Sequence, residues 1–242
     1  MKLKIISCNV MKRELCYSIS RTSNRVDVEF LYQGLHEFPK KLNKILGEAV
    51  AGVKRDEYDF LLINYGLCGK GTAGIGHPWL PIVINKKQDC IPLLVGDYEL
   101  YMNYLKEKPA TFWYSYGWIE GFPMPGGSDY VQKYSEFYNM KITEKQRETI
   151  ERMLIVNYQR LTFVYWEELG EKIYRLGREY TLKCLDYLNN HLGFNLEYGE
   201  LKGKPDLLQK LVNGEWDDAN FVIVPPGKKL GYDPLENQFT VE

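Results

Sequence analysis

Three cysteines and one histidine follow the expected carboxyl ends of successive strands in the first third of the chain. They are Cys8, His36, Cys68 and Cys90. Parallel strands lie about 4.8 Å apart and their carboxyl ends meet at one sheet edge, so side chains there converge. Thiolates and imidazole bind zinc and iron, and thiolates hold iron–sulfur clusters. The pattern predicts a metal site that holds either a [4Fe-4S] cluster or a single Zn or Fe ion, and the residues alone do not separate the two.

The same residues have plainer interpretations. Free cysteine packs as a small hydrophobic residue, and a turn histidine often caps or fills a core. We interpret Cys16 and Cys184 as such filler on helix faces, and His77 is an alternative to His36. The second half of the chain favours a real site, because its equivalent positions carry no Cys or His. Those positions hold Trp166, Lys202 and the turn 225–227.

A glycine-rich turn surrounds Cys68. Glycines allow close backbone approach, and their amides bind anions or cluster sulfurs. The spacing does not fit a Walker A loop, and no helix clearly follows it as a dinucleotide fingerprint requires. The residues predicted to bind a cofactor here are Gly66, Gly69, Lys70, Gly71 and Thr72.

Aromatic residues follow a later strand at the same expected edge. Trp118 is predicted to wall a cleft for a small organic substrate, although core packing is the simpler explanation for its neighbour Trp113. Glu120 is a candidate for proton transfer.

The elements that position these residues alternate between strand and helix. Residues 60–63 (FLLI) form a continuous apolar run, which is typical of a strand buried on both faces of a parallel sheet. Apolar positions at helical spacing follow Pro39, a residue that favours a helix start. The expected strands are 4–10, 26–32, 59–64, 80–84, 110–116, 161–165 and 221–224. The expected helices are 11–20, 39–50 and 91–106, with one or two more over 130–159.

The strand–helix–strand–helix–strand order occurs twice, which implies parallel sheets with right-handed crossovers. We therefore expect an α/β fold of two similar Rossmann-like halves with mainly parallel sheets. The expected boundaries are a first half over 1–125 that carries the Cys/His site, a helical connection over 126–160 and a second half over 161–242.

Composition and charge argue against nucleic acids and membranes as partners of this protein. Lys and Arg total 31 against 32 Asp and Glu, and no long basic run marks a nucleic-acid surface. No apolar run is long enough to span a membrane, and the first residues do not resemble a signal peptide. We expect a cytoplasmic protein that acts on a small molecule, with neither nucleic acid nor membrane as partner.

Several strings resemble the family of unknown function numbered 1638. They are YGLCGKGT (65–72), QDCIPLLVG (88–96), GWIE (117–120), LHEFP (35–39) and VPPG (224–227). The resemblance covers most of the chain, and the glycine–cysteine string is its most specific part. The resemblance implies a protein of anaerobic archaea and bacteria whose gene often lies near genes of corrinoid-dependent methyltransferases. It does not indicate which reaction the protein would catalyse.

Three hypotheses remain open from the sequence. The first is a metal-centred enzyme or accessory protein of anaerobic one-carbon metabolism, acting on a small thiol or organic substrate, with a corrinoid protein or methyltransferase as partner. The second is a non-catalytic binding module for a corrinoid protein or cofactor. The third is a nucleotide-dependent enzyme that uses the glycine turn.

Overall fold

The computed structural model describes residues 1–234 and 238–242 of the chain. It divides into two compact units, one formed by Met1–Gly96 with Pro205–Glu242 and the other by Asp97–Lys204. The α/β class with mainly parallel sheets is confirmed. The observed division differs from the expected boundaries after residues 125 and 160, because strand 111–115 pairs with strand 160–165.

The first unit is built on a five-stranded sheet in the order β2-β1-β3-β4-β8. The first four of these strands run parallel. The central strands β3 and β4 are apolar and buried throughout most of their length, as expected for strands covered on both faces. The strands are β1 (Lys2–Cys8), β2 (Arg25–Leu31), β3 (Phe60–Asn64), β4 (Ile82–Asn85) and β8 (Phe221–Val224).

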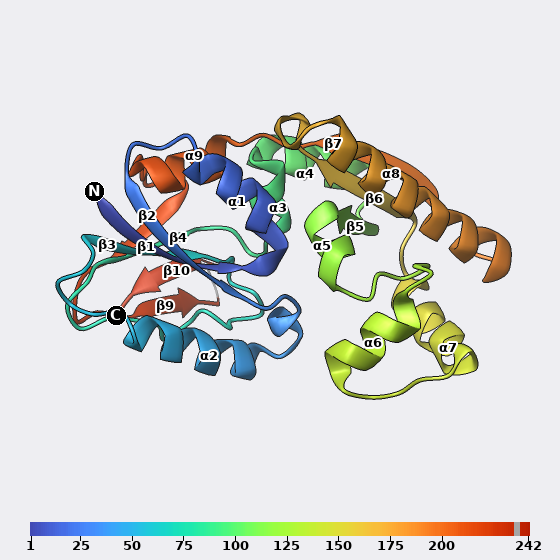
Figure 1. Cartoon of the computed structure of the whole chain (residues 1–242), viewed down its shortest axis with the longest axis horizontal. Helices are drawn as coiled ribbons and strands as arrows, with labels where there is room; N and C mark the ends of the chain where they lie inside the picture. Colours follow the sequence, from blue (N-terminus) through green and yellow to red (C-terminus); the bar gives the residue numbers. More distant parts are fainter. Residues whose placement is uncertain (235–237) are drawn as a thin grey trace. The chain divides into compact units, whose positions relative to one another are not determined.

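Helices cover both faces of this sheet (Figure 1). The chain moves from β1 outward to β2 and then returns past β1 to β3, so right-handed crossovers place α1 and α2 on opposite faces. Helix α9 packs beside α1, and α2 contacts β1. The helical segments of this unit are η1 (Asn9–Met11), α1 (Lys12–Ile19), η2 (Leu35–Glu37), α2 (Pro39–Ala51), α3 (Ile91–Val95) and α9 (Asp206–Asn213).

The expected repeat fails at strand β8. The sequence order predicts strand 221–224 as a parallel strand of a second half. In the structure β8 instead pairs antiparallel with β4, with Ile82 opposite Val224, and so completes the first unit's sheet. A β-hairpin of β9 (Leu230–Asp233) and β10 (Gln238–Val241) follows it. The second half is therefore not a separate copy of the first.

The second unit has its own parallel sheet, in the order β5-β6-β7. Its core gathers buried residues such as Tyr114, Phe163 and Leu188. The expected helix over 91–106 is split, because Gly96 adopts a left-handed φ of 70° that ends α3. The elements are α4 (Tyr98–Glu107), β5 (Thr111–Ser115), α5 (Tyr116–Gly121), α6 (Tyr130–Tyr138), α7 (Glu144–Ile155), β6 (Arg160–Tyr165), η3 (Glu167–Leu169), α8 (Glu171–Asp186), η4 (Tyr187–His191) and β7 (Glu197–Lys202).

Within the described residues, the helices are too short or too polar to cross a lipid bilayer.

Candidate functional site

The strand order of the first unit marks one place on the sheet edge. Successive connections leave β1 in opposite directions, first to β2 and then to β3. In open α/β sheets such a reversal opens a crevice beyond the carboxyl ends of the two strands, and ligands bind there. Cys8 is the last residue of β1, and Cys68 comes four residues after the end of β3. Two of the predicted ligands therefore flank this reversal point.

Cys8 lies at the buried end of β1, with 7% of its surface exposed. The neighbouring residue Ser7 pairs in register with Asn64 of β3, and the Asn64 amide donates a hydrogen bond to the Ser7 hydroxyl at 3.0 Å. Continuing the register by one residue brings Cys8 opposite Tyr65. The parallel pairing of β1 and β3 thus positions the first thiol beside the start of the loop that carries the second.

The loop after β3 holds Cys68 in an unusual backbone conformation. Cys68, Gly69 and Lys70 all have positive φ angles, of 47°, 64° and 72°. For a residue other than glycine this costs about 1–3 kcal/mol, and such strain concentrates at functional sites. The Cys68 amide donates to the Gln88 carbonyl at 2.9 Å, which ties this loop to the segment before Cys90.

Cys90 comes directly before α3, on the loop after β4. A second backbone hydrogen bond, from the Leu67 amide to the Lys87 carbonyl at 3.0 Å, joins the two loops. Gly66 makes this approach possible, because a Cβ built there would lie 2.6 Å from the Asp89 backbone nitrogen. The absence of a side chain at Gly66 therefore allows the Cys68 and Cys90 loops to pack together.

The three thiols influence one another electrostatically. Burial raises the pKa of Cys8 to about 11, and the Val10 amide offsets part of that effect. Burial, followed by the nearby Cys8, raises the pKa of Cys68 to about 12. Burial, Asp89, Cys8 and Cys68 raise the pKa of Cys90 well above that of an ordinary thiol. A thiolate at one of these cysteines disfavours the ionisation of the other two. The three thiols are therefore neutral near pH 7 until a bound cation compensates the negative charge.

Two buried polar atoms beside these thiols have no hydrogen-bond partner among the described residues. They are the Tyr65 hydroxyl and the Asn64 carbonyl oxygen Oδ1. Tyr65 is 2% exposed and Asn64 is fully buried. After burial itself, Cys8 is the strongest influence that raises the pKa of Tyr65. Buried unsatisfied polar groups cost about 1–3 kcal/mol each, so they suit a site that gains a hydrogen-bonding ligand.

The thiols are near one another without forming a single-ion site. Among residues 1–234 and 238–242, no group of three or more His, Cys, Asp or Glu side chains is arranged to hold one metal ion. A cluster of several irons is larger than one ion, so its cysteine ligands stand further apart. The donor set consists of thiolates from separate strand ends, which is the chemistry that holds iron–sulfur clusters. Three thiolates are ligands that suit either an iron–sulfur cluster or a zinc ion.

His36, the fourth predicted ligand, lies on η2 with an exposed side chain. Desolvation by the surrounding protein lowers the pKa of His36, which favours the neutral imidazole that binds metal. The alternative, His77, is buried and bonded to the backbone of Val53, Trp79 and Leu80.

The glycine-turn residues have two different roles. Thr72 is fully buried, and its hydroxyl donates to the Gly66 carbonyl at 3.3 Å. Gly71 is buried against Leu42, whose Cδ2 would lie 2.6 Å from an added Cβ. These two residues shape the loop. Gly69 and Lys70 are exposed and line a surface pocket.

Trp118 and Glu120 belong to the other unit, on α5. The indole of Trp118 packs edge-on against Phe122 at 5.3 Å and joins the core of that unit. Glu120 is exposed at the surface of the same helix. Within their own unit, Trp118 therefore acts as a core residue and Glu120 as a surface carboxylate.

Sequence analysis missed three asparagine and tyrosine residues at the strand ends. Asn64 ends β3 and Tyr65 follows it, and Asn85 ends β4, where its amide donates to the Tyr65 carbonyl at 2.6 Å. Asn85 is 1% exposed. A signal was present, because the apolar runs of both strands end in the same Ile–Asn pair. Buried amides at the ends of adjacent parallel strands indicate a polar site at their shared edge.

The fold and this edge define the class: an α/β protein with one buried and two half-buried thiols near the reversal point of a mainly parallel sheet. The chain belongs to the family described as Protein of unknown function (DUF1638), whose model matches residues 30–212. The matched range includes Cys68 and Cys90 and begins after Cys8. No curated protein and no solved structure matches the chain significantly.

Proposed function

We propose that this protein binds an iron–sulfur cluster through Cys8, Cys68 and Cys90, with one coordination position open to a small ligand. It would work as a metal-centred enzyme or accessory protein of anaerobic one-carbon metabolism. The observation that carries the proposal is the close packing of the loops after β3 and β4 at the end of β1. The contact of Gly66 with Asp89 and the hydrogen bond from Cys68 to Gln88 support it.

The chain's own residues would prepare the site in three ways. The strand ends bring the sulfurs together without needing sequence proximity, and Asn85 holds the Tyr65 backbone in place. The Tyr65 hydroxyl is available to donate to a thiolate or a cluster sulfide. A cluster with three cysteine ligands leaves one iron open, and that iron supplies a Lewis acid for a thiol or another small donor.

Reconstitution under anaerobic conditions tests the ligands. The purified protein would be incubated with ferrous iron and sulfide, and iron, sulfide and the absorbance near roughly 400 nm would be measured. We expect about four irons per chain in the wild type. Cys8→Ser, Cys68→Ser and Cys90→Ser should each lose most of the iron. Cys16→Ser is the exposed control and Cys184→Ser the buried control, and both should keep it.

His36→Ala decides whether the open position is filled by the protein. Unchanged iron content with a changed electron paramagnetic resonance spectrum would place His36 on the fourth iron. Equal iron content in all five cysteine variants would refute the cluster. A colourless protein with stoichiometric zinc, lost in the same three variants, would replace the cluster with a single ion.

The metabolic setting rests on the family resemblance, and it has its own test. Metal-free and reconstituted protein would be titrated with a cobalamin and with a purified corrinoid protein. Binding by the reconstituted form alone supports a metal-centred role. Equal binding by both forms would favour the non-catalytic module for a corrinoid partner.

A further inference from the structure

A second candidate site lies on the surface of the first unit, beside the loop that carries Cys68. It is a hollow of about 870 Å³ between the start of α2 and the glycine turn. Ligand pockets usually span about 300–1,000 Å³, so it has room for a small organic molecule. Its lining consists of Phe38, Pro39, Lys40, Lys41, Asn43, Gly69, Lys70 and Ala73.

Three lysines give this hollow its charge. Lys40, Lys41 and Lys70 line it, and all three are exposed. In the described part of the chain, none of them forms an ion pair with a carboxylate. Lys41 instead lies 5.4 Å from the centre of the Tyr32 ring, and Lys70 lies 5.4 Å from that of Tyr232. Contacts with aromatic rings leave the positive charge in place, so the hollow carries three charges that an anion would neutralise.

The architecture holds these charges together rather than leaving them on a flexible surface. The Asn43 amide donates to the Gly71 carbonyl at 3.1 Å and to the Ala73 carbonyl at 2.7 Å, which fixes the glycine turn against α2. Pro39 also packs on the turn, with its Cγ 3.0 Å from an added Cβ at Gly69. The positive φ of Lys70 is therefore set by a braced loop.

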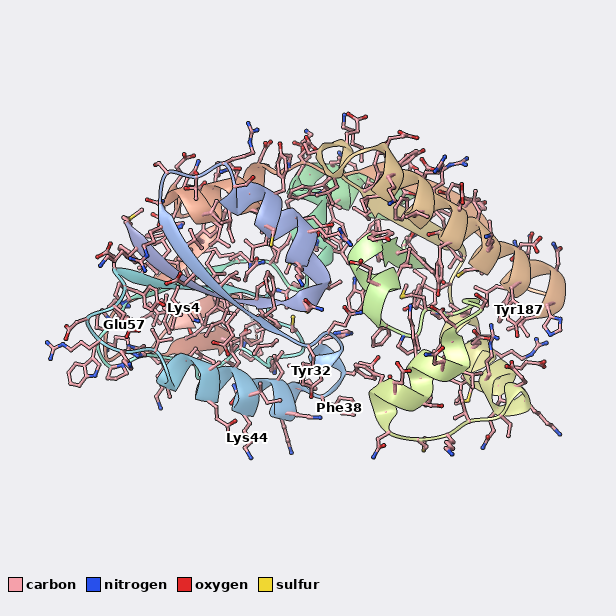
Figure 2. All side chains as sticks on the ribbon, viewed as in Figure 1. Lys4, Tyr32, Phe38, Lys44, Glu57 and Tyr187 are labelled. Carbon is pink, nitrogen blue, oxygen red and sulfur yellow. The ribbon has the colours of Figure 1, made fainter. Side chains whose placement is uncertain are left out.

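The hollow also has an apolar side. Phe38 is 45% exposed, and with Pro39 and Ala73 it provides carbon surface next to the lysines. Figure 2 labels Tyr32 and Phe38 in the segment that joins β2 to α2. A ligand that suits both sides has an anionic head and an organic body.

We propose that this hollow binds a small organic phosphate. A phosphate monoester carries nearly two negative charges at pH 7, and a diphosphate carries more, which matches three lysines better than a single carboxylate does. Lysine binds phosphate as a point charge and does not require the planar geometry that arginine gives. Phe38 and Pro39 would contact the organic part.

This site is distinct from the thiols in its chemistry. Its lysines, asparagine and apolar residues do not include a cysteine, and it would bind its ligand in the metal-free protein. The Cys68–Lys70 backbone nevertheless connects the two sites directly, because the same left-handed segment presents Cys68 and Lys70. A phosphate bound here would therefore lie at the edge of the loop that holds the proposed cluster ligand.

Binding would be measured on the full metal-free chain, with inorganic phosphate, pyrophosphate and ADP as soluble probes and sulfate as the non-phosphate anion. Isothermal titration and the shift in melting temperature would both be recorded, at low and at high salt. We expect pyrophosphate and ADP to raise the melting temperature and ADP to bind more tightly than pyrophosphate, because of its organic part. Higher salt should weaken binding, since the lysines are exposed.

The variants separate the hollow from general surface charge. Lys40→Ala and Lys41→Ala remove a charge from α2, and Lys70→Asn removes one while keeping a residue that tolerates positive φ. Each should weaken ADP binding about tenfold, in line with the loss of one charged contact. Lys44→Ala is the matched control on the same helix. Lys44 lies outside the lining, pairs with Glu48 and is 77% exposed (Figure 2).

The outcomes decide between this site and its competitors. No binding by any soluble phosphate, or equal loss in Lys44→Ala and the lining variants, would overturn the proposal. Binding only to vesicles containing a phosphoinositide, or only to RNA, would also overturn it and identify a surface instead of a small-molecule site. Normal iron loading in the lysine variants together with lost ADP binding would show that the two sites fail independently.

Discussion

The polar groups at the carboxyl edges of the two sheets differ in whether they have hydrogen-bond or ion-pair partners. In the second unit, the Ser115 hydroxyl at the end of β5 accepts from the Trp118 amide and begins α5. At the end of β7, Lys202 pairs with Glu167. In the first unit, three thiols converge near a tyrosine hydroxyl and an asparagine oxygen that lack partners within the described chain. In the second unit, the polar groups at these positions have partners within the protein. In the first unit, two polar atoms at the edge lack such partners, and they suit a bound ligand.

The same contrast appears inside the units. In the second unit, the Glu200 carboxylate accepts from Tyr174, Tyr198 and Arg178, and those contacts keep its pKa below its usual value. The buried Glu151 accepts from the Gly126 amide and pairs with Arg147. Polar residues in this unit therefore hold loops and helices together. From this comparison we expect the proposed chemistry to depend on the first unit more than on the second.

Breaking the buried ion pair of the second unit should have the largest effect on stability. Glu151→Ala removes the buried carboxylate that pairs with the Arg147 guanidinium and leaves that guanidinium with the exposed Glu144, and the loss of a buried ion-pair partner costs about 3–5 kcal/mol. Urea unfolding followed by circular dichroism would measure the loss. If the chemistry belongs to the first unit, iron bound per folded chain should not change at low denaturant. A parallel loss of iron in the folded protein would contradict the comparison.

Gly66→Ala should reduce both stability and metal binding. The added methyl group would meet the Asp89 backbone at 2.6–2.9 Å, and overpacking of this kind costs about 1–3 kcal/mol. Because the clash separates the Cys68 and Cys90 loops, iron content should fall as well. Gly170→Ala in the second unit is the control. Gly170 has a φ of 87° and open space around it, so that variant should lose about 1–3 kcal/mol through backbone strain alone and no iron.

Alkaline pH should destabilise the metal-free protein through the raised thiol pKa values. Below about pH 8, the thiols are protonated in both the folded and the unfolded chain, so their contribution is fully present. Above that, the unfolded chain loses its protons first, and the free energy of unfolding falls until the folded pKa of Cys8, about 11, is passed. Cys8 alone accounts for about 2–3 kcal/mol.

Cys8→Ala measures that contribution by difference. The variant should show a shallower fall in unfolding free energy between about pH 9 and pH 11 than the wild type, when both are free of metal. The difference cancels the titration of lysines and tyrosines that both proteins share. Identical slopes in the two proteins would show that Cys8 is not desolvated as the structure places it.

The smallest expected effects have opposite signs in the two units. Tyr65→Phe removes a buried hydroxyl that interacts with the Cys8 thiol, a weak hydrogen-bonding group, and should stabilise the metal-free protein by at most about 1 kcal/mol. Tyr114→Phe removes a hydroxyl that donates to the Pro125 carbonyl at 2.5 Å, and should destabilise it by about 1–2 kcal/mol. Thermal unfolding of the two variants side by side gives the signs.

The same two variants, Tyr65→Phe and Tyr114→Phe, can be compared again in the reconstituted protein, by their reduction potentials. If Tyr65 donates to the cluster, Tyr65→Phe should lower the reduction potential, because hydrogen bonds to sulfur stabilise the reduced cluster. Tyr114→Phe should leave the potential unchanged. A Tyr65→Phe variant that is less stable without metal would mean that its hydroxyl already has a partner.

The sequence predicted the elements better than it predicted their partners. Local patterning predicts the apolar run of β3, the helix α2 that begins at Pro39 and the end of β1 at Cys8. The partner of β8 does not, because a short apolar strand has the same pattern whether it pairs parallel or antiparallel, and whether it lies near in sequence or far away. That pairing depends on contacts with β4, more than a hundred residues earlier in the chain.

The candidate site shows the same limit. Residue types and strand ends pointed to the three cysteines, which remain a prediction as metal ligands. Tyr65 and Asn85 were missed because tyrosine and asparagine have many structural roles, and only burial without a partner or at a shared edge distinguishes them. The lysine-lined hollow depends on how α2 meets the glycine turn, and no spacing in the sequence records that contact.

The antiparallel strand β8 also sets an order for synthesis. The cysteines of the proposed site are all translated within the first 90 residues. The outer edge of β4, however, is covered only after residues 221–224 have been translated and have paired with it. An uncovered strand edge is a template for association with other chains. Since domains fold largely as they leave the ribosome, the nascent chain passes through a stage in which its thiols are present and its sheet is still open.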